Sequence, residues 1–473
     1  MKRPNILLIY TDQLRWDALG VNGNSEVKTP NLDHLASEGV NFDHHFVQHP
    51  LCMPSRVSFL SGQYPATLGI TQMGVPVPEE LQILPHFLKP AGYTTANIGK
   101  LHFLPHANRD HREPHPAYGF DYLEISDEPG VYEDAYRAWA KAKDASQLGH
   151  LSVGLPPARR TYLNVMGLDD GIAHPQTGPL SGPRDDFSGP ISFAGDERFT
   201  HSAFVEEQTC GFLERQSEQP FLCVASFYSP HAPWAVPQQF LDLYKPETFE
   251  LPSYPDELQS ERDAARCSNE RLRSARHGYY AMISEVDHYV GQILETLEAQ
   301  GLADNTLVVF IADHGEWLGD HLKYGKGYPG DDAVSRVPLM FRWPEGIKNP
   351  GRTVPEIIEA VDVLPTLLGA AGLQISPQLQ GQSLLPALQD RLFSGKGSAL
   401  MEYHGWKNLR TDNYRYLIHA DGSESLWDLQ NDPHEYHDVT TEPDYQGMLA
   451  EHRRFMLTRL LGLERPLART WPY

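Results

Sequence analysis

The sequence has few cysteines, few basic residues and no long apolar run, and each absence excludes a class of protein. Its four cysteines, Cys52, Cys210, Cys223 and Cys267, are too few and too irregularly spaced for a disulfide framework or a zinc site. It carries 39 Lys and Arg residues against 62 Asp and Glu residues, which argues against the basic surface that nucleic-acid binding needs. No stretch approaches the roughly 18 apolar residues that cross a membrane. The sequence therefore predicts a globular protein that binds neither nucleic acid nor membrane.

Little at the amino terminus resembles a secretion signal. Lys2 and Arg3 precede the apolar run "NILLIY", but this run is short and leads into "TDQ" without a small-residue cleavage site. We interpret the run as a buried strand, and with few cysteines the expected compartment is the reducing cytoplasm. The net charge of −23 does not exclude an anionic substrate, because a few converging cationic side chains can outweigh a distant negative surface.

Three apolar runs predict parallel strands that end in polar residues. They are residues 4–10, residues 307–312 and the run within "QPFLCVASFYSPHAPW". In open α/β sheets, ligands bind beyond the carboxyl ends of the strands, so the polar residues that follow these runs are expected at one edge. Those polar residues are Asp12, Gln13, Asp313, His314 and His231.

The length of 473 residues suits a large α/β domain with a smaller partner. We assign residues 1–373 to the α/β domain and residues 374–473 to an α+β subdomain, with short strands at "YRYLIHA" and "ESLWDL" and a terminal helix beginning near Tyr445. The stretch "YYAMISEVDHYVGQILETLEAQ" predicts a long amphipathic helix that Gly301 ends. Residues 103–196 have weak periodicity and are predicted to be loops over the site.

The stretch "LCMPSRVSFLSG" places Cys52 at the beginning of a predicted helix, since Pro54 suits the first helical turn. Free backbone N–H groups and the helix dipole favour an anion at that end, and Arg56 adds a cation one turn on. An isolated cysteine is usually a buried structural thiol. The neighbours of Cys52 instead favour an anion-binding site.

"CMPSRVSFLSG" resembles the signature of the sulfatase family, Cys-x-Pro-Ser-Arg-x-x-x-Leu-(Ser/Thr)-Gly, at every defined position. The resemblance implies that a maturation enzyme oxidises Cys52 to formylglycine, whose aldehyde hydrates to a geminal diol. One hydroxyl then attacks sulfur and displaces the alcohol. The second hydroxyl loses a proton and expels sulfate by C–O cleavage, which divides the reaction into two easier steps.

The pairs Asp12-Gln13 and Asp313-His314 resemble the metal ligands of this family, although each pair alone is only a polar strand end. The resemblance implies that they and the oxidised Cys52 hold one divalent cation, which polarises the hydrate and the sulfate. Many members have Asp where this chain has Gln13 and Asn where it has His314. The mainly oxygen shell favours calcium, and the nitrogen ligand leaves manganese or magnesium open.

Three shorter stretches also match the family: "NIGKLHF", "SPHAPW" and "HLKYGKG". By resemblance, His231 protonates the leaving alcohol and His102 takes the proton from the second hydroxyl. In "HLKYGKG", Lys326 matches the sulfate-binding lysine, with Lys323 as the alternative register. The residues implied to neutralise the sulfate oxygens are Arg56, Lys100 and Lys326.

The resemblance covers nearly the whole chain, with residues 103–199 the least matched, and it implies an alkaline-phosphatase-like fold with a large, mostly parallel sheet flanked by helices. The implied partners are a small-molecule or carbohydrate sulfate ester and the formylglycine-generating enzyme. A phosphonate monoester or phosphodiester hydrolase on the same scaffold is the first alternative, and Ser55 within the signature favours sulfate over it. A catalytically inactive anion- or sugar-binding relative and a two-metal phosphatase or mutase are weaker alternatives.

The sequence does not identify the alcohol or the oligomeric state. Trp234 either stacks on a sugar or aryl ring of the substrate or packs in the core. The segment "HANRDHREPH" suits either a polar rim for a carbohydrate ester or a solvated loop. Its candidate residues are His106, Asn108, Arg109, His111, Arg112 and His115.

Overall fold

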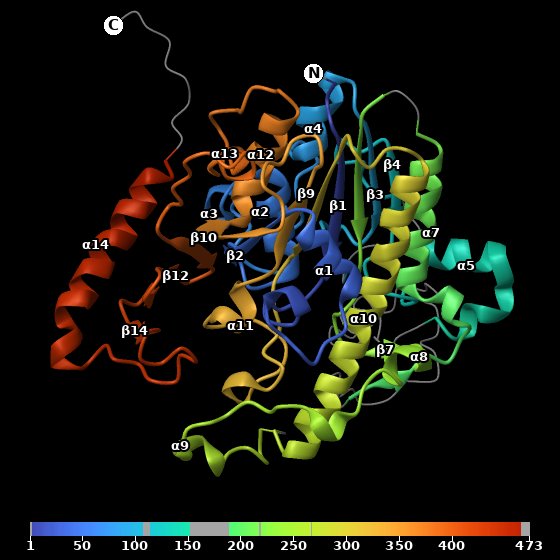
Figure 1. Ribbon diagram of the computed structural model, residues 1–473. Helices are drawn as coiled ribbons and strands as arrows, with labels where there is room; N and C mark the ends of the chain where they lie inside the picture. The colour runs from blue at the N-terminus through green and yellow to red at the C-terminus, as the bar shows by residue number, and fades with distance from the viewer. Residues whose placement is uncertain (1, 107–113, 152–188, 217–218, 266, 465–473) are drawn as a thin grey trace, which may run out of the picture.

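An eight-stranded sheet forms the centre of the computed structural model, which describes residues 2–106, 114–151, 189–216, 219–265 and 267–464 (Figure 1). All neighbouring pairs are parallel except the two that β9 makes with β2 and β8. This arrangement confirms the predicted α/β class. In spatial order the strands are β10 (Arg352–Glu359), β2 (Val40–Phe46), β9 (Leu339–Arg342), β8 (Thr306–Ala312), β1 (Asn5–Thr11), β6 (Phe221–Ser226), β3 (Thr94–Gly99) and β4 (Tyr122–Ile125).

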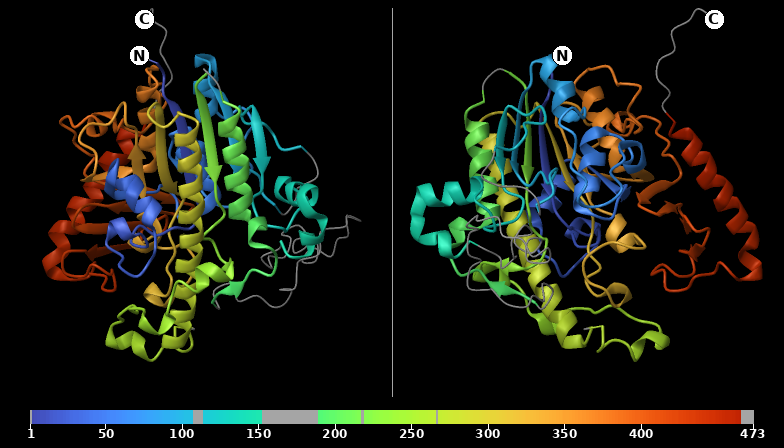
Figure 2. Two further views of the ribbon diagram at one scale, coloured as in Figure 1. Left: turned by 45° about the vertical axis from the view of Figure 1, so that its right-hand side comes forward. Right: turned by 180° about the vertical axis from the view of Figure 1, so that it is seen from behind.

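Helices cover both faces of this sheet (Figure 2). Helices α1 (Pro30–Ser37), α7 (His201–Glu214) and α10 (Asn269–Ala299) pack together on one face. Helices α2 (Cys52–Ser61), α4 (Leu84–Leu88) and α12 (Val363–Ala370) pack together on the other. With both faces covered, the central strands β1, β6 and β8 are buried along their whole length, as their continuous apolar sequences predict.

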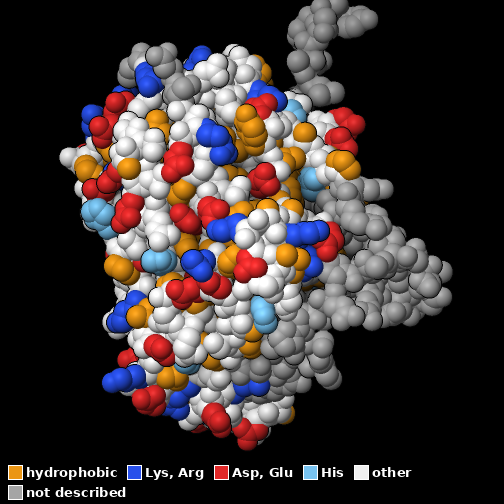
Figure 3. All heavy atoms as spheres, turned by 90° about the vertical axis from the view of Figure 1, so that its right-hand side faces the viewer, with side chains coloured by type: hydrophobic (Ala, Val, Ile, Leu, Met, Phe, Trp, Pro, Cys, Tyr) orange, Lys and Arg blue, Asp and Glu red, His pale blue; other side chains and the backbone are white. Residues whose placement is uncertain are grey.

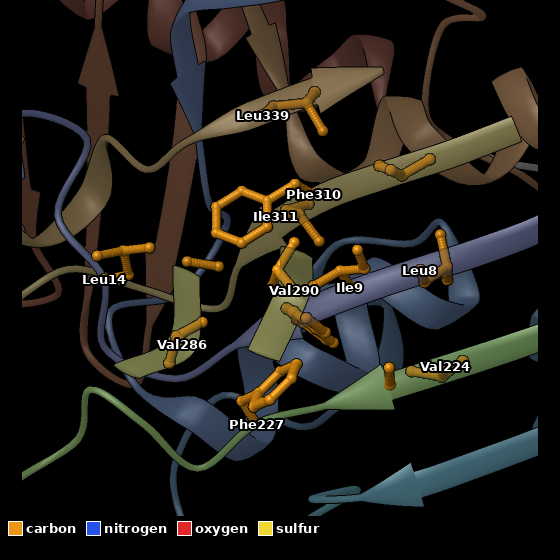
Figure 4. Packing of buried hydrophobic residues seen from close by; sticks show 14 of the residues in the cluster. Leu8, Ile9, Leu14, Val224, Phe227, Val286, Val290, Phe310, Ile311 and Leu339 are labelled. Carbon is orange, nitrogen blue, oxygen red and sulfur yellow. The ribbon is translucent and has the colours of Figure 1, made fainter. Parts of the chain in front are cut away.

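The core beneath α10 shows how these layers pack (Figure 4). Val286 and Val290 of α10 lie against Ile9 of β1 and Phe310 of β8, and all four side chains are at most 1% exposed. Helix α10 begins ten residues before the predicted stretch, because Ser268 caps its first turn by accepting a hydrogen bond from the Arg271 N–H. It ends at Ala299 and is followed by Gly301 at φ +64°, as predicted.

A four-stranded antiparallel sheet follows near the carboxyl terminus and confirms the predicted short strands. It consists of β11 (Ala399–Tyr403), β12 (Trp406–Arg410), β13 (Tyr414–His419) and β14 (Glu424–Asp428). The terminal helix α14 (Gln446–Gly462) packs on it through Leu449 and Met456 (Figure 1). The boundary between residues 373 and 374 stays a prediction.

The region predicted to be loops contains regular structure. Strand β4 extends the sheet beside β3, and α5 (Ala135–Asp144) begins where the Asp134 side chain accepts a hydrogen bond from the Arg137 N–H. Strand β4 has only four residues, which is too few to show a clear period in the sequence. Among the described residues, the remaining short α-helices and strands are α3 (Pro65–Leu68), α8 (Gln238–Leu241), α9 (Asp256–Gln259), α11 (Asp332–Ser335), α13 (Leu385–Leu388), β5 (Ile191–Ser192) and β7 (Ala235–Val236).

The surface and the cysteines agree with the bulk composition. Figure 3 shows a face on which the described basic side chains are interspersed with acidic ones. All four cysteines are buried free thiols. Over the part of the chain that the structure describes, no helix has the length and apolar character to cross a membrane.

Candidate active site

The ends of two neighbouring strands meet the start of α2 and form a buried polar cluster. Strands β1 and β8 are parallel, with Thr11 opposite Ala312, so the residues that follow each strand emerge side by side. One ligand atom from each of four buried residues lies within 4.8 Å of the others. These residues are Asp12, Cys52, Asp313 and His314.

Cys52 is the first residue of α2 and lies among both acidic and cationic groups. Its Sγ is 2.8 Å from Lys326 Nζ, 3.1 Å from His314 Nε2 and 3.7 Å from Asp12 Oδ1. Burial raises the pKa of the Cys52 thiol, but Lys326 and Lys100 outweigh burial and lower it well below its ordinary value. The position therefore stabilises negative charge, and the two lysines are the main cause.

The ring of His314 is oriented by the backbone. Its Nδ1 is 2.9 Å from the carbonyl oxygen of Gly315. A carbonyl can only accept, so Nδ1 carries a proton and Nε2 is the ring nitrogen that faces Cys52 and Asp12. Histidines that bind metal ions are typically held in this way.

Gln13 has φ +65°, and its backbone is fixed on both sides. Its N–H donates to Asp313 Oδ1 at 3.0 Å, and its carbonyl accepts from the Tyr279 hydroxyl at 2.7 Å. Its side-chain Nε2 donates to Glu316, whereas Oε1 is buried without a hydrogen-bond partner among the described residues. A buried acceptor without a partner is costly, and a cation bound here would satisfy it. Two carboxylates, one amide oxygen and one imidazole thus fit a divalent cation.

Arg56 and Lys100 place two buried cations beside the carboxylates. Arg56 Nε is 2.7 Å from Asp313 Oδ2, and its Nη1 donates to the carbonyl oxygen of Lys100 at 3.0 Å. Lys100 forms an ion pair with Asp12 through Nζ, which lies 5.1 Å from the centre of the Tyr228 ring. Arg56 Nη1 also donates to Ser226 Oγ at 2.9 Å, whereas Nη2 is buried without a hydrogen-bond partner among the described residues, so Nε alone is hydrogen-bonded to a candidate metal ligand.

His102 lies where the backbone turns after β3. Its φ is +55°, and its N–H donates to Asp127 Oδ1 at 2.8 Å, as does the N–H of Leu101 at 2.9 Å. A hydrogen bond from the His102 side chain contributes to lowering the pKa of the Cys52 thiol. The buried carboxylate of Asp127 therefore holds His102 in a left-handed conformation beside Cys52.

His231 follows strand β6 in the chain, and its side chain interacts with Cys52. Its Nδ1 is 2.5 Å from the carbonyl oxygen of Ala232 and 2.9 Å from the Tyr228 hydroxyl. The Ala232 carbonyl fixes a proton on Nδ1, which leaves Nε2 as the ring nitrogen that can gain or lose a proton. Burial and the charge of Lys326 lower the pKa of His231.

The structure places the residues of two alternatives left by the sequence. Lys326 contacts Cys52, whereas Lys323 Nζ lies 4.8 Å from the centre of the Trp317 ring and donates to the carbonyl oxygen of Tyr328. Trp234 is fully buried against Tyr279, so it packs in the core.

The proposed polar rim is described only in part. Residues 107–113 lie outside the described residues, so Asn108, Arg109, His111 and Arg112 cannot be placed. His106 is buried and stacks on His102, with ring centres 4.7 Å apart. His106 therefore packs against the His102 ring and does not form part of an exposed rim.

A family model described as Sulfatase matches residues 4–373, which include every candidate site residue. The chain belongs to the sulfatase family. A second model, described as N-sulphoglucosamine sulphohydrolase, C-terminal, matches residues 319–460 of this sulfatase.

Similar proteins align over almost the full length of this sulfatase. An arylsulfatase of Clostridium perfringens is 29% identical over 493 residues, covering 98% of this chain and 95% of that protein. The crystal structure of the phosphonate monoester hydrolase of Agrobacterium radiobacter superimposes with a TM-score of 0.82 at 24% identity, covering 98% and 96% of the two chains. A structure solved with its substrate D-glucosamine-2-N,6-O-disulfate has a TM-score of 0.74 at 21% identity and covers 98% of both chains. These two structures show a shared fold.

The sequence did not indicate three residues that support the site. Asp127 holds the backbone of His102, Tyr228 contacts His231, and Glu316 contacts Gln13. Asp127 lies in the least matched region, where no motif marks it. Tyr228 and Glu316 lie within three residues of recognised histidines, and that proximity is the only signal that could have found them.

Proposed function

We propose that this sulfatase hydrolyses sulfate monoesters with formylglycine made from Cys52 by a maturation enzyme. The main support is that Cys52 Sγ lies within hydrogen-bonding distance of Lys326 and His314, inside a buried cluster of candidate metal ligands. In this arrangement Sγ stands in for an oxygen of the hydrated aldehyde. The proposed metal ligands are Asp12, Gln13, Asp313 and His314, together with the oxidised residue 52.

The two implied groups would supply the chemistry that ordinary side chains lack. Formylglycine supplies a hydroxyl nucleophile and a second hydroxyl for release of sulfate, and a divalent cation supplies positive charge that polarises oxygen. Three of the four protein donor side chains offer oxygen, which supports calcium, with manganese or magnesium as the alternatives.

The described cations suit an anionic substrate. Lys100 and Lys326 lie on either side of Asp12, and Lys326 also reaches Cys52, so positive charge surrounds the position where sulfate would bind. Because both ammonium groups are held before the substrate arrives, they stabilise charge that develops in the transition state without reorganising. Arg56 contributes its charge while it orients Asp313.

The two histidines support separate proton transfers. His231 Nε2, with Nδ1 held by Ala232, is proposed to protonate the leaving alcohol. His102, which contacts Cys52 from its own loop, is proposed to remove the proton from the second hydroxyl. The relation to the structure that holds a sulfated sugar supports a carbohydrate or small-molecule sulfate ester as substrate.

A His231→Ala variant should lose activity according to the leaving group. We expect kcat/KM for alkyl sulfates to fall by about 10²–10⁴-fold, because a poor leaving group needs the proton. The loss for 4-nitrophenyl sulfate should be much smaller, since that leaving group departs as a stable anion. Steady-state kinetics over a series of alcohols measures the difference, and His45→Ala, which removes a buried histidine of β2, is the control. Equal losses across the series would exclude His231 as the general acid.

The proposed reaction is tested with sulfate monoesters, phosphonate monoesters and phosphodiesters that carry the same aryl leaving group. Because the aryl leaving group is the same in all three substrates, differences in rate reflect only the group that is cleaved from it, which is sulfate, phosphonate or phosphodiester. We expect the highest kcat/KM for the sulfate. Faster hydrolysis of the phosphonate or the diester would instead identify the protein as a phosphonate monoester or phosphodiester hydrolase, the activity named for one of the structures that shares its fold. Absence of turnover on all three by mature protein would favour an inactive binding relative.

A further inference from the structure

We propose that Glu316 is a positioning residue that determines which end of the Gln13 amide faces the cation. The inference rests on the proposed metal site and deepens it. Glu316 is not itself among the candidate ligands, and it lies two residues beyond His314 on the chain that leads to Lys326.

The carboxylate of Glu316 is held in place by backbone hydrogen bonds in addition to its contact with Gln13. Its Oε1 accepts hydrogen bonds from the N–H of Leu318 at 2.9 Å and from the N–H of Gly325 at 2.5 Å. Its Oε2 accepts from Gln13 Nε2. Glu316 is fully buried, so no rearrangement towards solvent competes with these contacts. Two backbone donors therefore fix the acceptor that Gln13 meets.

Gln13 has one important freedom left. Its N–H and carbonyl are both hydrogen-bonded within the core, to Asp313 and Tyr279, so the main chain is fixed. The side-chain amide can still rotate by half a turn and exchange its oxygen for its NH₂ group at almost no steric cost. Both Glu316 oxygens accept in the structure, Oε1 from two backbone N–H groups and Oε2 from Gln13 Nε2, so this contact selects the orientation with Nε2 towards Glu316. Gln13 Oε1 is then the end left without a protein partner.

This orientation matters because only one end of an amide can bind a cation. An NH₂ group directed at the cation would remove one ligand and place partial positive charge against it. An aspartate at this position would need no such partner, since its two oxygens are equivalent. Glutamine as a metal ligand therefore depends on a fixed acceptor behind it, and Glu316 is that acceptor.

The variant Glu316→Gln tests this logic because it keeps the shape of the side chain. The two N–H groups of Leu318 and Gly325 require an oxygen at the position of Oε1. The new NH₂ group must then face Gln13, which has to turn its own oxygen towards it and its NH₂ group towards the cation. The exchanged pair Gln13→Glu with Glu316→Gln restores the match, because an NH₂ donor at position 316 again meets an acceptor and leaves a carboxylate oxygen for the cation.

The experiment measures Ca²⁺ and Mn²⁺ affinity of the full chain by competition with a chromophoric chelator. We expect E316Q to bind about 10–100-fold more weakly than wild type, the usual effect of losing a residue that orients a ligand. The exchanged pair should bind within a few-fold of wild type. The matched control is Glu285→Gln, which changes another buried carboxylate, on α10, and should leave affinity unchanged.

The outcomes separate this inference from the proposed function. If wild type binds neither cation, the proposed metal site fails. If wild type binds and E316Q binds equally tightly, only the role of Glu316 is overturned. Circular dichroism of the metal-free proteins checks folding. Should E316Q not fold, the exchanged pair decides: affinity near wild type supports the pairing, and affinity at least tenfold weaker overturns it.

Discussion

A Cys52→Ala variant should lose turnover by a factor on the order of 10⁴ or more, as other enzymes do when the nucleophile is removed. Alanine has no group that can be oxidised to an aldehyde, so both hydroxyls of the proposed nucleophile are lost together. The fold should persist, because Cys52 lies at the first turn of α2 and a smaller side chain fits there. The measurement compares the rate at which the Cys52→Ala variant and the wild type hydrolyse the same sulfate ester.

A matched control for this variant is Cys223→Ala, a fully buried thiol in the middle of β6. Burial raises the pKa of the Cys223 thiol, whereas the surrounding cations lower that of Cys52, so the two thiols differ in environment and not in exposure. Cys223→Ala should reduce stability slightly and leave kcat/KM within a few-fold of wild type. Retention of full activity by Cys52→Ala would contradict the proposed nucleophile.

An Asp313→Asn variant should lose both the cation and catalysis. Asp313 accepts a hydrogen bond from the Gln13 N–H through Oδ1 and from the Arg56 guanidinium through Oδ2, so one carboxylate contacts both a candidate metal ligand and a proposed sulfate-binding cation. The amide removes a negative charge from the site and leaves the buried Arg56 with a weaker counter-ion. We expect wild type to purify with about one divalent cation per chain and the variant with almost none. Turnover should fall about 10³-fold or more, since metal-assisted polarisation is lost.

Elemental analysis of the purified proteins measures the cation, and the same kinetic assay measures the activity. The control is Asp287→Asn on α10, a buried carboxylate that accepts hydrogen bonds from Asn31 and Leu32 away from the cluster. It should lower thermal stability without changing metal content. A cation content unchanged in Asp313→Asn would show that this carboxylate is not a ligand.

Strands β1 and β8, which carry the site, could be predicted because each apolar run changes abruptly to polar residues at its end. The apolar runs of β1 and β8 are buried on both faces, and the change to Asp12 and Asp313 marks the edge where the sheet ends. The helix that begins at Cys52 was likewise marked by Pro54. Contact between these elements follows from the parallel pairing of neighbouring strands, which places their ends together.

The supporting contacts could not be predicted because they depend on positions far apart in the chain. Asp127 reaches His102 across 25 residues, and Glu316 reaches Gln13 across 303 residues. In the sequence, Asp127 and Glu316 look like any other acidic residue. Each supports the site only because the fold buries its carboxylate next to a hydrogen-bond donor, which is the His102 N–H for Asp127 and the Gln13 side-chain NH₂ for Glu316. The sequence also could not show which of Lys323 and Lys326 lies beside Cys52. The two lysines are three positions apart in one loop, and only the folded loop shows that Lys323 faces Trp317 while Lys326 contacts Cys52.

The central claim is tested most directly by the mass of the peptide that contains Cys52, from protein produced together with a formylglycine-generating enzyme and shown to hydrolyse a sulfate ester. Conversion of the thiol to the aldehyde lowers the peptide mass by about 18 Da. We predict that this lighter peptide is present and that activity rises in proportion to its fraction across preparations. Full activity in a preparation whose Cys52 peptide has only the unmodified mass would contradict the account.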